Sequence, residues 1–218
     1  MKFIIPIFSL FVGLVIFAQD PVEIQDPKAD PYLKNISKDL KTESPYRIEF
    51  KYEIYSLQED AKVSDNGTII IHDEKYQLKT EDTEVYYNGQ TLWSYNIMNE
   101  EVYQSEPEEG SGDKLFSDPF RLLANYNEYF KYRFLGEKNI NAQKLIEIDL
   151  YPKDLETPYS MIKLFTTTDK SLYSINIKQK NGIDLKIFIT KITHNINISE
   201  SDFSWDEASH SNVLLIEM

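Results

Sequence analysis

Histidine and cysteine most often ligate metals or act as nucleophiles and bases, and this chain offers few of them. Its three histidines, His72, His194 and His210, are far apart in the sequence, and none has a second ligand at a metal-binding spacing. Cysteine is absent, which excludes a thiol nucleophile and a thiolate metal site. No glycine-rich phosphate loop, nucleophile elbow or zincin motif occurs. The sequence therefore predicts neither an enzyme, nor a metal site, nor a cofactor.

Large aromatic side chains are the second group that could do chemistry, here the non-covalent binding of an apolar ligand. The chain has 15 tyrosines, 12 phenylalanines and two tryptophans. Broad, stiff rings suit a pocket for hydrocarbon, but the same rings can simply fill the interior of a small barrel, and both interpretations are open. The candidate ligand-binding residues on the predicted inner faces and on a predicted covering helix are Ile48, Phe50, Tyr52, Ile54, Trp93, Tyr95, Phe120, Leu123, Phe130, Tyr132, Phe134 and Ile148.

The start of the chain has the form of an export signal. Residues 1–18 begin with one positive charge, continue as an apolar run and end at the small residue Ala18. This pattern predicts a secretory signal peptide cleaved after Ala18 and a single domain over residues 19–218; an uncleaved anchor is the alternative. Without cysteine there is neither a disulfide nor a lipidation site, so we expect the exported protein to be free and soluble.

The charge of the chain limits its partners. The formal net charge of −13 becomes −14 once Lys2 is removed with the signal peptide. Such a surface repels the phosphates of nucleic acids and anionic lipid headgroups, which argues against nucleic acid as a partner and against stable adsorption to a membrane. The charge can also serve solubility alone.

The elements that must position the aromatic residues begin with a helix over residues 31–41. Asp30 is a favourable N-cap and Pro31 suits the first helical position. The apolar face of this helix consists of Leu33, Ile36 and Leu40.

Strands follow the first helix. The stretch YRIEFKYEIY (46–55) alternates apolar and charged residues, as a strand with one dry and one wet face does. Asn66-Gly67, Asn88-Gly89 and Asn181-Gly182 lie between strand-like runs and favour the positive φ angles of type I′ turns. The sequence predicts three hairpins there, and about eleven strands in one antiparallel sheet that curls.

A second helix interrupts the strands. In SDPFRLLANY (117–126), Ser117 or Asp118 caps the helix, and Phe120 and Leu123 lie on one side of it. This short amphipathic helix must cover apolar surface. It forms either a lid over the concave face of the sheet, together with the first helix, or a seal at one open end of a barrel.

Short motifs along the chain point to a family: NGQTLWSY (88–95), DPFRLL (118–123), LYP (150–152), and SDFSWD (201–206) with NVLLIEM (212–218) after it. In this order and spacing they resemble the periplasmic lipoprotein-carrier family LolA, whose patterns include a DGKxLWxY hairpin, an xxPFxLL lid helix and an L.P strand end. The opening helix and strand at 26–55 are similar as well, so the resemblance covers nearly the whole mature chain.

The resemblance implies an α+β fold, a strongly curved antiparallel half-barrel with helices covering its open side. An apolar cavity between helices and sheet would shelter the acyl chains of lipoproteins. The implied function is a periplasmic carrier or chaperone that moves lipoproteins from the inner to the outer membrane. Its implied partners are lipoproteins with acylated N-termini, an inner-membrane ABC-type lipoprotein-releasing transporter and an outer-membrane receptor.

The resemblance has one departure. Family members often carry an arginine followed by proline after an early strand, and it helps to latch the lid. Here the region reads HDEKYQL (72–78), where Lys75 could act as a point charge without the planar fork of arginine. A paralogue that carries another lipid is therefore one alternative. A lipid-binding regulatory or sensory module that acts through a membrane signalling partner is another. A hydrolase is a third, against which the lack of catalytic residues argues.

Overall fold

The computed structural model describes residues 25–42, 44–106, 119–210 and 212–218. The signal peptide predicted at 1–18 and the helix cap predicted at Ser117 or Asp118 lie outside these residues. The strands are β1 (Tyr46–Ser56), β2 (Ala61–His72), β3 (Lys75–Thr80), β4 (Thr83–Tyr87), β5 (Leu92–Asn96), β6 (Glu101–Ser105), β7 (Phe130–Ile140), β8 (Gln143–Pro152), β9 (Tyr159–Thr167), β10 (Leu172–Gln179), β11 (Ile183–His194) and β12 (Leu214–Glu217). The helices are α1 (Asp30–Thr42), α3 (Pro119–Ala124), α4 (Tyr126–Tyr129) and the 3₁₀ helices η1 (Glu200–Phe203) and η2 (Glu207–Ser209).

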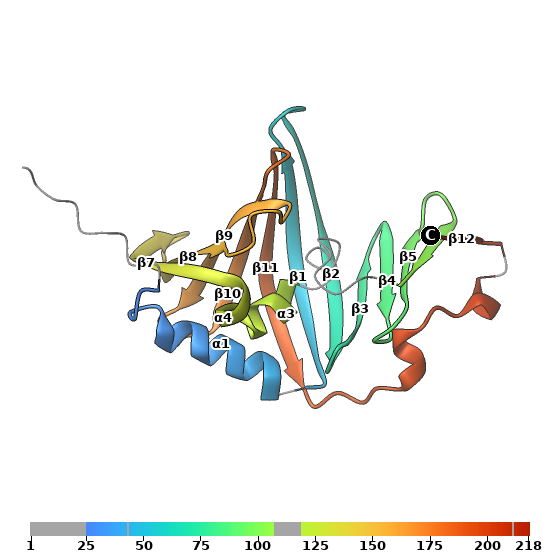
Figure 1. Ribbon diagram of the computed structural model, residues 1–218, viewed down its shortest axis with the longest axis horizontal. Helices are drawn as coiled ribbons and strands as arrows, with labels where there is room; N and C mark the ends of the chain where they lie inside the picture. Colours follow the sequence, from blue (N-terminus) through green and yellow to red (C-terminus); the bar gives the residue numbers. More distant parts are fainter. Residues whose placement is uncertain (1–24, 43, 107–118, 211) are drawn as a thin grey trace, which may run out of the picture.

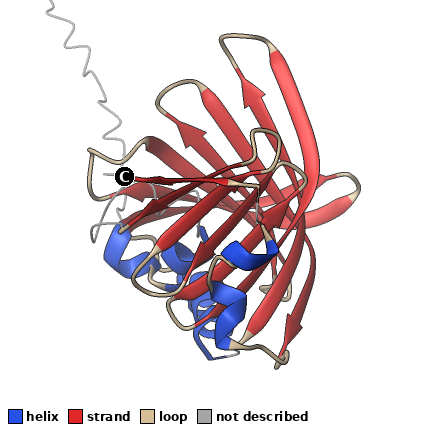
Figure 2. Cartoon of the chain, turned by 90° about the vertical axis from the view of Figure 1, so that its right-hand side faces the viewer, coloured by secondary structure: helices blue, strands red, loops and turns tan. Residues whose placement is uncertain are grey.

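The described strands form one curved sheet (Figures 1 and 2). Its twelve strands follow the order β12-β6-β5-β4-β3-β2-β1-β11-β10-β9-β8-β7. In the described part of the chain the outermost strands, β12 and β7, do not pair with each other, so the sheet is not closed. This large curved, unclosed sheet agrees with the predicted half-barrel.

The last strand differs from the prediction of a purely antiparallel sheet. The strand β12 pairs in parallel with β6, in the register Leu214↔Glu101 to Glu217↔Gln104. It is connected to β11 by the long segment that contains η1 and η2, not by a hairpin, and only such a long connection can bring a strand back in the parallel sense.

The predicted hairpins at Asn88-Gly89 and Asn181-Gly182 are confirmed. Gly89 has φ 99° between β4 and β5, and Gly182 has φ 84° between β10 and β11. In the first, the Asn88 side chain accepts hydrogen bonds from the backbone N–H groups of Gln90 (2.9 Å) and Thr91 (2.8 Å), which stabilises a turn longer than a two-residue type I′ connection.

The predicted hairpin at Asn66-Gly67 is wrong. Both residues lie inside β2, where Gly67 pairs with Phe50 of β1 and with Thr80 of β3. The chain turns instead at residues 57–60, where Asp60 has φ 49°. Gly67 is needed in the strand for space, because a Cβ atom there would lie 2.6 Å from Cζ of Phe50.

The predicted first helix is confirmed as α1. Its apolar face is buried, and its first residue, Asp30, accepts a hydrogen bond of 2.7 Å from the Tyr132 hydroxyl of β7. The helix packs on α3, where the Ser37 hydroxyl donates to the backbone carbonyl of Ala124 (2.5 Å). The first helix is therefore held both by the far edge of the sheet and by the second helix.

One face of the sheet, called the inner face below, carries most of the core. Its strands contribute rows of alternating apolar residues, and α1 and α3 pack against them. The buried inner-face residues at the centre of the sheet include Ile48, Ile69, Ile148, Leu150, Ile162, Leu164, Ile175 and Ile177. The opposite, outer face of β3–β5 is covered in part by η1 and the segment after it.

Candidate functional site

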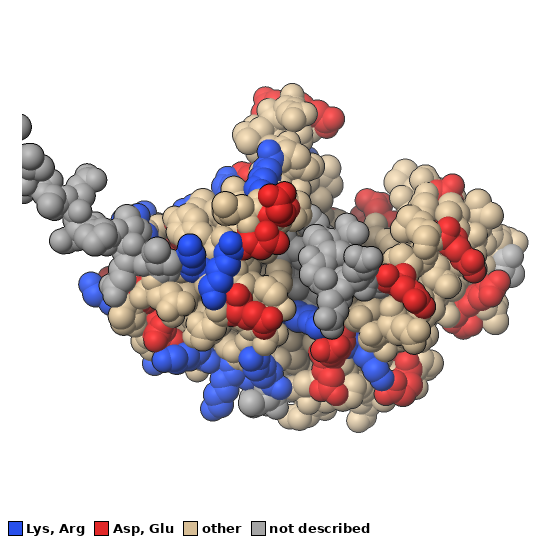
Figure 3. Space-filling view, viewed as in Figure 1, with Lys and Arg blue, Asp and Glu red and all other residues tan. Residues whose placement is uncertain are grey.

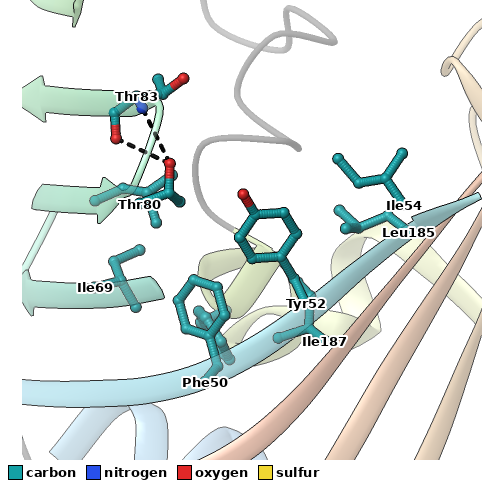
Figure 4. A pocket seen from close by; sticks show the side chains of 10 residues that line it. Phe50, Tyr52, Ile54, Ile69, Thr80, Thr83, Leu185 and Ile187 are labelled. Carbon is teal, nitrogen blue, oxygen red and sulfur yellow. Dashed lines mark hydrogen bonds between the residues drawn. The ribbon is translucent and has the colours of Figure 1, made fainter. Parts of the chain in front are cut away.

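The inner face is not filled everywhere, and a cavity of about 230 Å³ remains between β1, β2, β3, β11 and α3 (Figure 4). Most of its lining is apolar. The residues are Phe50, Tyr52, Ile54, Ile69, Leu78, Thr80, Thr83, Phe120, Leu185 and Ile187. The hollow can therefore hold an apolar group, because aliphatic and aromatic side chains offer it contacts without demanding hydrogen bonds.

The long strand β1 provides the axis of the cavity. Phe50, Tyr52 and Ile54 alternate along it, and Tyr52 and Ile54 pair with Ile187 and Leu185 of β11. Exposure increases in steps from Ile48 (0%) through Phe50 (6%) to Ile54 (36%), so the cavity deepens toward Ile48 and opens near Ile54. The distance between the α-carbons of Phe50 and Ile54 is about 13 Å for four strand residues.

Polar groups lie on one side of the cavity (Figure 4). The Thr80 hydroxyl donates to the backbone carbonyl of Thr83 (3.2 Å) and accepts from its N–H (3.1 Å). Burial raises the pKa of the Tyr52 hydroxyl, and the carboxylates of Asp65, Asp82 and Glu81 raise it further. Tyr52 is thus a neutral hydroxyl at physiological pH, with its oxygen on the polar side.

The structure brings together some of the predicted ligand-binding residues. Phe50, Tyr52, Ile54 and Phe120 line the cavity. Five others are buried in the packed core that surrounds it: Ile48, Leu123, Phe130, Tyr132 and Ile148. Phe134 is partly buried, and its ring lies 6.0 Å from that of Tyr32. Ligand binding by these residues stays a prediction.

The structure does not bring Trp93 and Tyr95 to the cavity. The turn at Asn88 sets the register Tyr87↔Leu92, and Leu92 packs with the inner-face core. Trp93 and Tyr95 therefore point to the outer face, where the Tyr95 ring lies 4.9 Å from that of Trp205. A one-residue difference in strand phase moves every side chain to the other face, which is why the prediction missed this.

Six lining residues were missed by the sequence analysis: Ile69, Leu78, Thr80, Thr83, Leu185 and Ile187. The alternation in KYQLKT (75–80) and DLKIFITK (184–191) and the apolar run in TIIIH (68–72) indicate strands with an apolar face, so the two leucines and two isoleucines could have been found. The two threonines carry no comparable sequence pattern, because only the β3–β4 turn brings them to the rim.

The region expected to latch the lid uses other residues than the resemblance implied. Lys75 forms an ion pair with Glu200 of η1. The helix α3 is joined to the β2–β3 turn by Arg121, whose Nη2 lies 3.2 Å from Oε1 of Glu74. A second and more polar cavity of about 200 Å³ lies beside this pair, between α3 and the end of α1.

The three histidines lie in separate aromatic contacts. His72 stacks with Phe203 at 6.3 Å between ring centroids, and His210 stacks with Trp205 at 4.0 Å. His194 lies 6.2 Å from the Tyr46 ring. Within the described residues there is no group of three or more His, Cys, Asp or Glu side chains that could hold a metal ion.

Charge is unevenly distributed over the surface. On the face seen in Figure 3, most Lys and Arg side chains lie on the half formed by α1 and β7–β9, whereas the half formed by β4–β6 shows Asp and Glu. Among the helices in the described ranges, none is long and apolar enough to cross a membrane.

The family model described as outer membrane lipoprotein carrier protein LolA matches residues 75–206, which is more than half of the 218 residues. No curated protein matches the sequence. The match includes β3–β11, α3 and η1, and therefore most of the elements that line the cavity.

Solved structures are similar to this chain at low sequence identity. A conserved protein of unknown function from Thermus thermophilus has a TM-score of 0.52 and 7% identity, over 87% of this chain and 99% of that chain. A DUF1329 family protein from Desulfovibrio piger has a TM-score of 0.49 and 13% identity, over 85% and 98%. A LolA superfamily protein from Nitrosomonas europaea has a TM-score of 0.44 and 10% identity, over 81% and 97%.

Proposed function

Because the chain belongs to the LolA family, the outer membrane lipoprotein carrier proteins, we propose that it is a periplasmic carrier of lipoproteins. It shelters their acyl chains in the apolar cavity while they pass from the inner to the outer membrane. The protein acts by binding and not by catalysis. Its export depends on the signal sequence at residues 1–18.

The observation that supports this proposal most directly is the cavity itself. An acyl chain of about sixteen carbons costs on the order of 10 kcal/mol to expose to water, at about 0.8 kcal/mol per methylene. A carrier must remove most of that surface from water. An apolar cavity of about 150 Å³ already binds benzene in another protein, and the cavity here has about 230 Å³.

A whole acyl chain needs more room than this cavity offers, since pockets for drug-sized ligands begin at about 300 Å³. We therefore propose that α3 acts as a cover that moves when cargo enters. Phe120 of α3 lies in the lining, so a shift of this helix enlarges the cavity directly. The exposed ion pair between Arg121 and Glu74 adds little stability to the closed position, which suits a cover that must open.

The proposed partners follow from this route. Lipoproteins with acylated N-termini are the cargo, an inner-membrane ABC-type transporter supplies them, and an outer-membrane receptor accepts them. The acidic half of the surface favours basic contact regions on those partners.

Two measurements test the proposal. Protein purified from its own cell envelope is examined by native mass spectrometry, and we expect lipid or lipopeptide adducts that are lost in an Ile187→Asp variant. An Asn99→Asp variant, altered in an exposed turn, is the matched control and keeps the adducts. Depletion of the protein in cells should leave lipoproteins in the inner membrane.

The outcomes separate the proposed function from its alternatives. Adducts together with normal lipoprotein sorting after depletion would favour a lipid-binding regulatory module. Absence of adducts from the unaltered protein would overturn the acyl-chain cavity altogether.

A further inference from the structure

The Phe50 ring lies close to Gly67 of the neighbouring strand. Phe50 of β1 pairs directly with Gly67 of β2. A Cβ atom built on Gly67 would lie 2.6 Å from Cζ and 2.7 Å from Cε2 of this ring. Real carbon atoms do not approach so closely, so the ring occupies the space that a side chain at position 67 would take.

Glycine is present at this position for space and not for backbone conformation. The residue lies within a regular strand, and positive φ angles are found at Gly89, Gly136 and Gly182 but not at Gly67. Glycine inside a strand costs stability and often marks a close approach of another group. Here that group is the Phe50 ring.

A β-bulge in β11 lies beside Phe50. The pairing of β1 with β11 shifts between Glu49 and Phe50, and Thr190 is left out of the register. The Thr190 hydroxyl donates to the backbone carbonyl of Glu49 (2.7 Å). The bulged strand is β11, and on its other side Phe50 keeps a regular pairing with Gly67 of β2.

The ring lies at the deep end of the cavity. Exposure along the inner face of β1 falls from Ile54 at the open end to Phe50, and the next inner-face residue, Ile48, is fully buried. Phe50, Gly67 and Thr80 also border a second hollow of about 340 Å³, together with the outer-face residues Glu49, Thr68 and Lys79. A single layer of residues therefore closes the cavity at this point.

We infer that Phe50, held against Gly67, is the floor of the acyl-chain cavity and determines the length of chain that it accepts. This inference rests on the proposed function and adds a determinant of specificity to it. The ring occupies the space that a side chain at position 67 would take, and this gives the cavity its depth at Phe50. An acyl chain whose end just reaches the Phe50 ring is fully buried. A longer acyl chain leaves some of its methylenes exposed to water.

Two substitutions change the floor in opposite directions. In Gly67→Ala the new methyl group cannot retreat, because the backbone carbonyl oxygen of Lys79 lies 3.2 Å away on its other side, so the ring must move into the cavity. In Phe50→Ala the ring is absent and the cavity deepens. Each methylene gained or lost from burial changes affinity about fourfold.

The experiment measures the affinities of synthetic lipopeptides that carry a dodecanoyl, a hexadecanoyl or an octadecanoyl chain. We expect Gly67→Ala to reduce the preference for hexadecanoyl over dodecanoyl by at least fourfold. Phe50→Ala should raise the preference for octadecanoyl over hexadecanoyl by a similar factor. Ratios between chain lengths are unaffected by the fraction of protein that is folded, so a destabilised variant still reports on the floor.

Ser64→Ala, an exposed change in the same strand, is the control and keeps the unaltered ratios. If Gly67→Ala does not fold, Phe50→Ala decides alone. If the unaltered protein binds normally and Phe50→Ala leaves the affinity ratios between chain lengths unchanged, Phe50 is not the floor of the cavity. The proposed carrier function is not affected by that result. Failure of the unaltered protein to bind any of the lipopeptides would overturn both.

Discussion

Two parts of the inner face have the same sequence pattern and different packing. On β7–β10 the alternating residues are buried, with Phe130, Ile148, Leu164 and Ile175 all at 0% exposure. On β1, β3 and β11 the same alternation borders a cavity, and Tyr52, Leu78 and Leu185 remain partly exposed. We call these the packed half and the cavity half.

The two halves differ in the helices that cover their apolar residues. The packed half is covered by α1 and α4, which are fixed to it by the Asp30 contact with Tyr132 and by the backbone hydrogen bond from Lys153 to Tyr129. Among the described residues, Phe120 of α3 is the helix side chain that lines the cavity half. An apolar row is therefore core where a helix is anchored along it and a candidate binding surface where the described helices leave a hollow.

The largest expected effect is in the packed half. Phe130→Ala removes a ring with 0% exposure and should lower the free energy of unfolding by about 3–5 kcal/mol. Ile54→Ala at the open end of the cavity should lower it by less than about 1 kcal/mol, because that residue already meets water. Urea denaturation of both variants measures this, and equal losses would mean that the two halves do not differ.

The second effect separates two residues of α3. Leu123 packs in the core, so Leu123→Ala should cost about 2–5 kcal/mol of stability. Phe120 is buried as well, at 1% exposure, and it also lines the cavity. Phe120→Ala should therefore cost about 3–5 kcal/mol of stability and should in addition weaken hexadecanoyl lipopeptide binding by the folded protein at least tenfold, which Leu123→Ala should not. Denaturation and binding measured on the same preparations check this. Equal weakening of binding by both variants would mean that Phe120 does not contact the cargo.

The smallest effect concerns the anchor of the packed half. Hydrogen bonds from the Tyr132 hydroxyl and from Lys34 lower the pKa of the Asp30 carboxyl below its usual 3.8. A carboxyl with a lowered pKa adds stability that is present above the unfolded value and is lost as pH falls through the folded value. Tyr132→Phe should therefore cost about 1 kcal/mol at neutral pH, and this deficit should shrink below pH 3.8 as Asp30 takes up a proton.

Thermal unfolding across pH measures that deficit. Lys144→Gln, which removes an exposed ion pair with Glu137, is the control and should show no such trend. A deficit that is independent of pH would mean that Tyr132 acts only by packing.

The sequence predicts those features of the site that depend on residues close to one another along the chain. The spacing around Asp30 indicates α1, the alternation of 46–55 places Phe50, Tyr52 and Ile54 on one face, and two of three Asn-Gly turns are confirmed. Trp93 shows the limit of such reasoning. The face of the sheet to which Trp93 points depends on the number of residues in the turn at Asn88. One residue more or fewer in that turn would have placed Trp93 on the inner face.

Local sequence by itself determined where this chain forms helices and strands, and that it has an apolar, aromatic-rich face to bury. Both follow from propensities and periods that act within a few residues. Only the tertiary structure decided which part of that face stays hollow. That depends on residues far apart in the chain, such as Phe50 against Gly67, and Phe120 and Ile187 in one cavity lining. A cavity remains where side chains from distant parts of the chain do not fill the space between them.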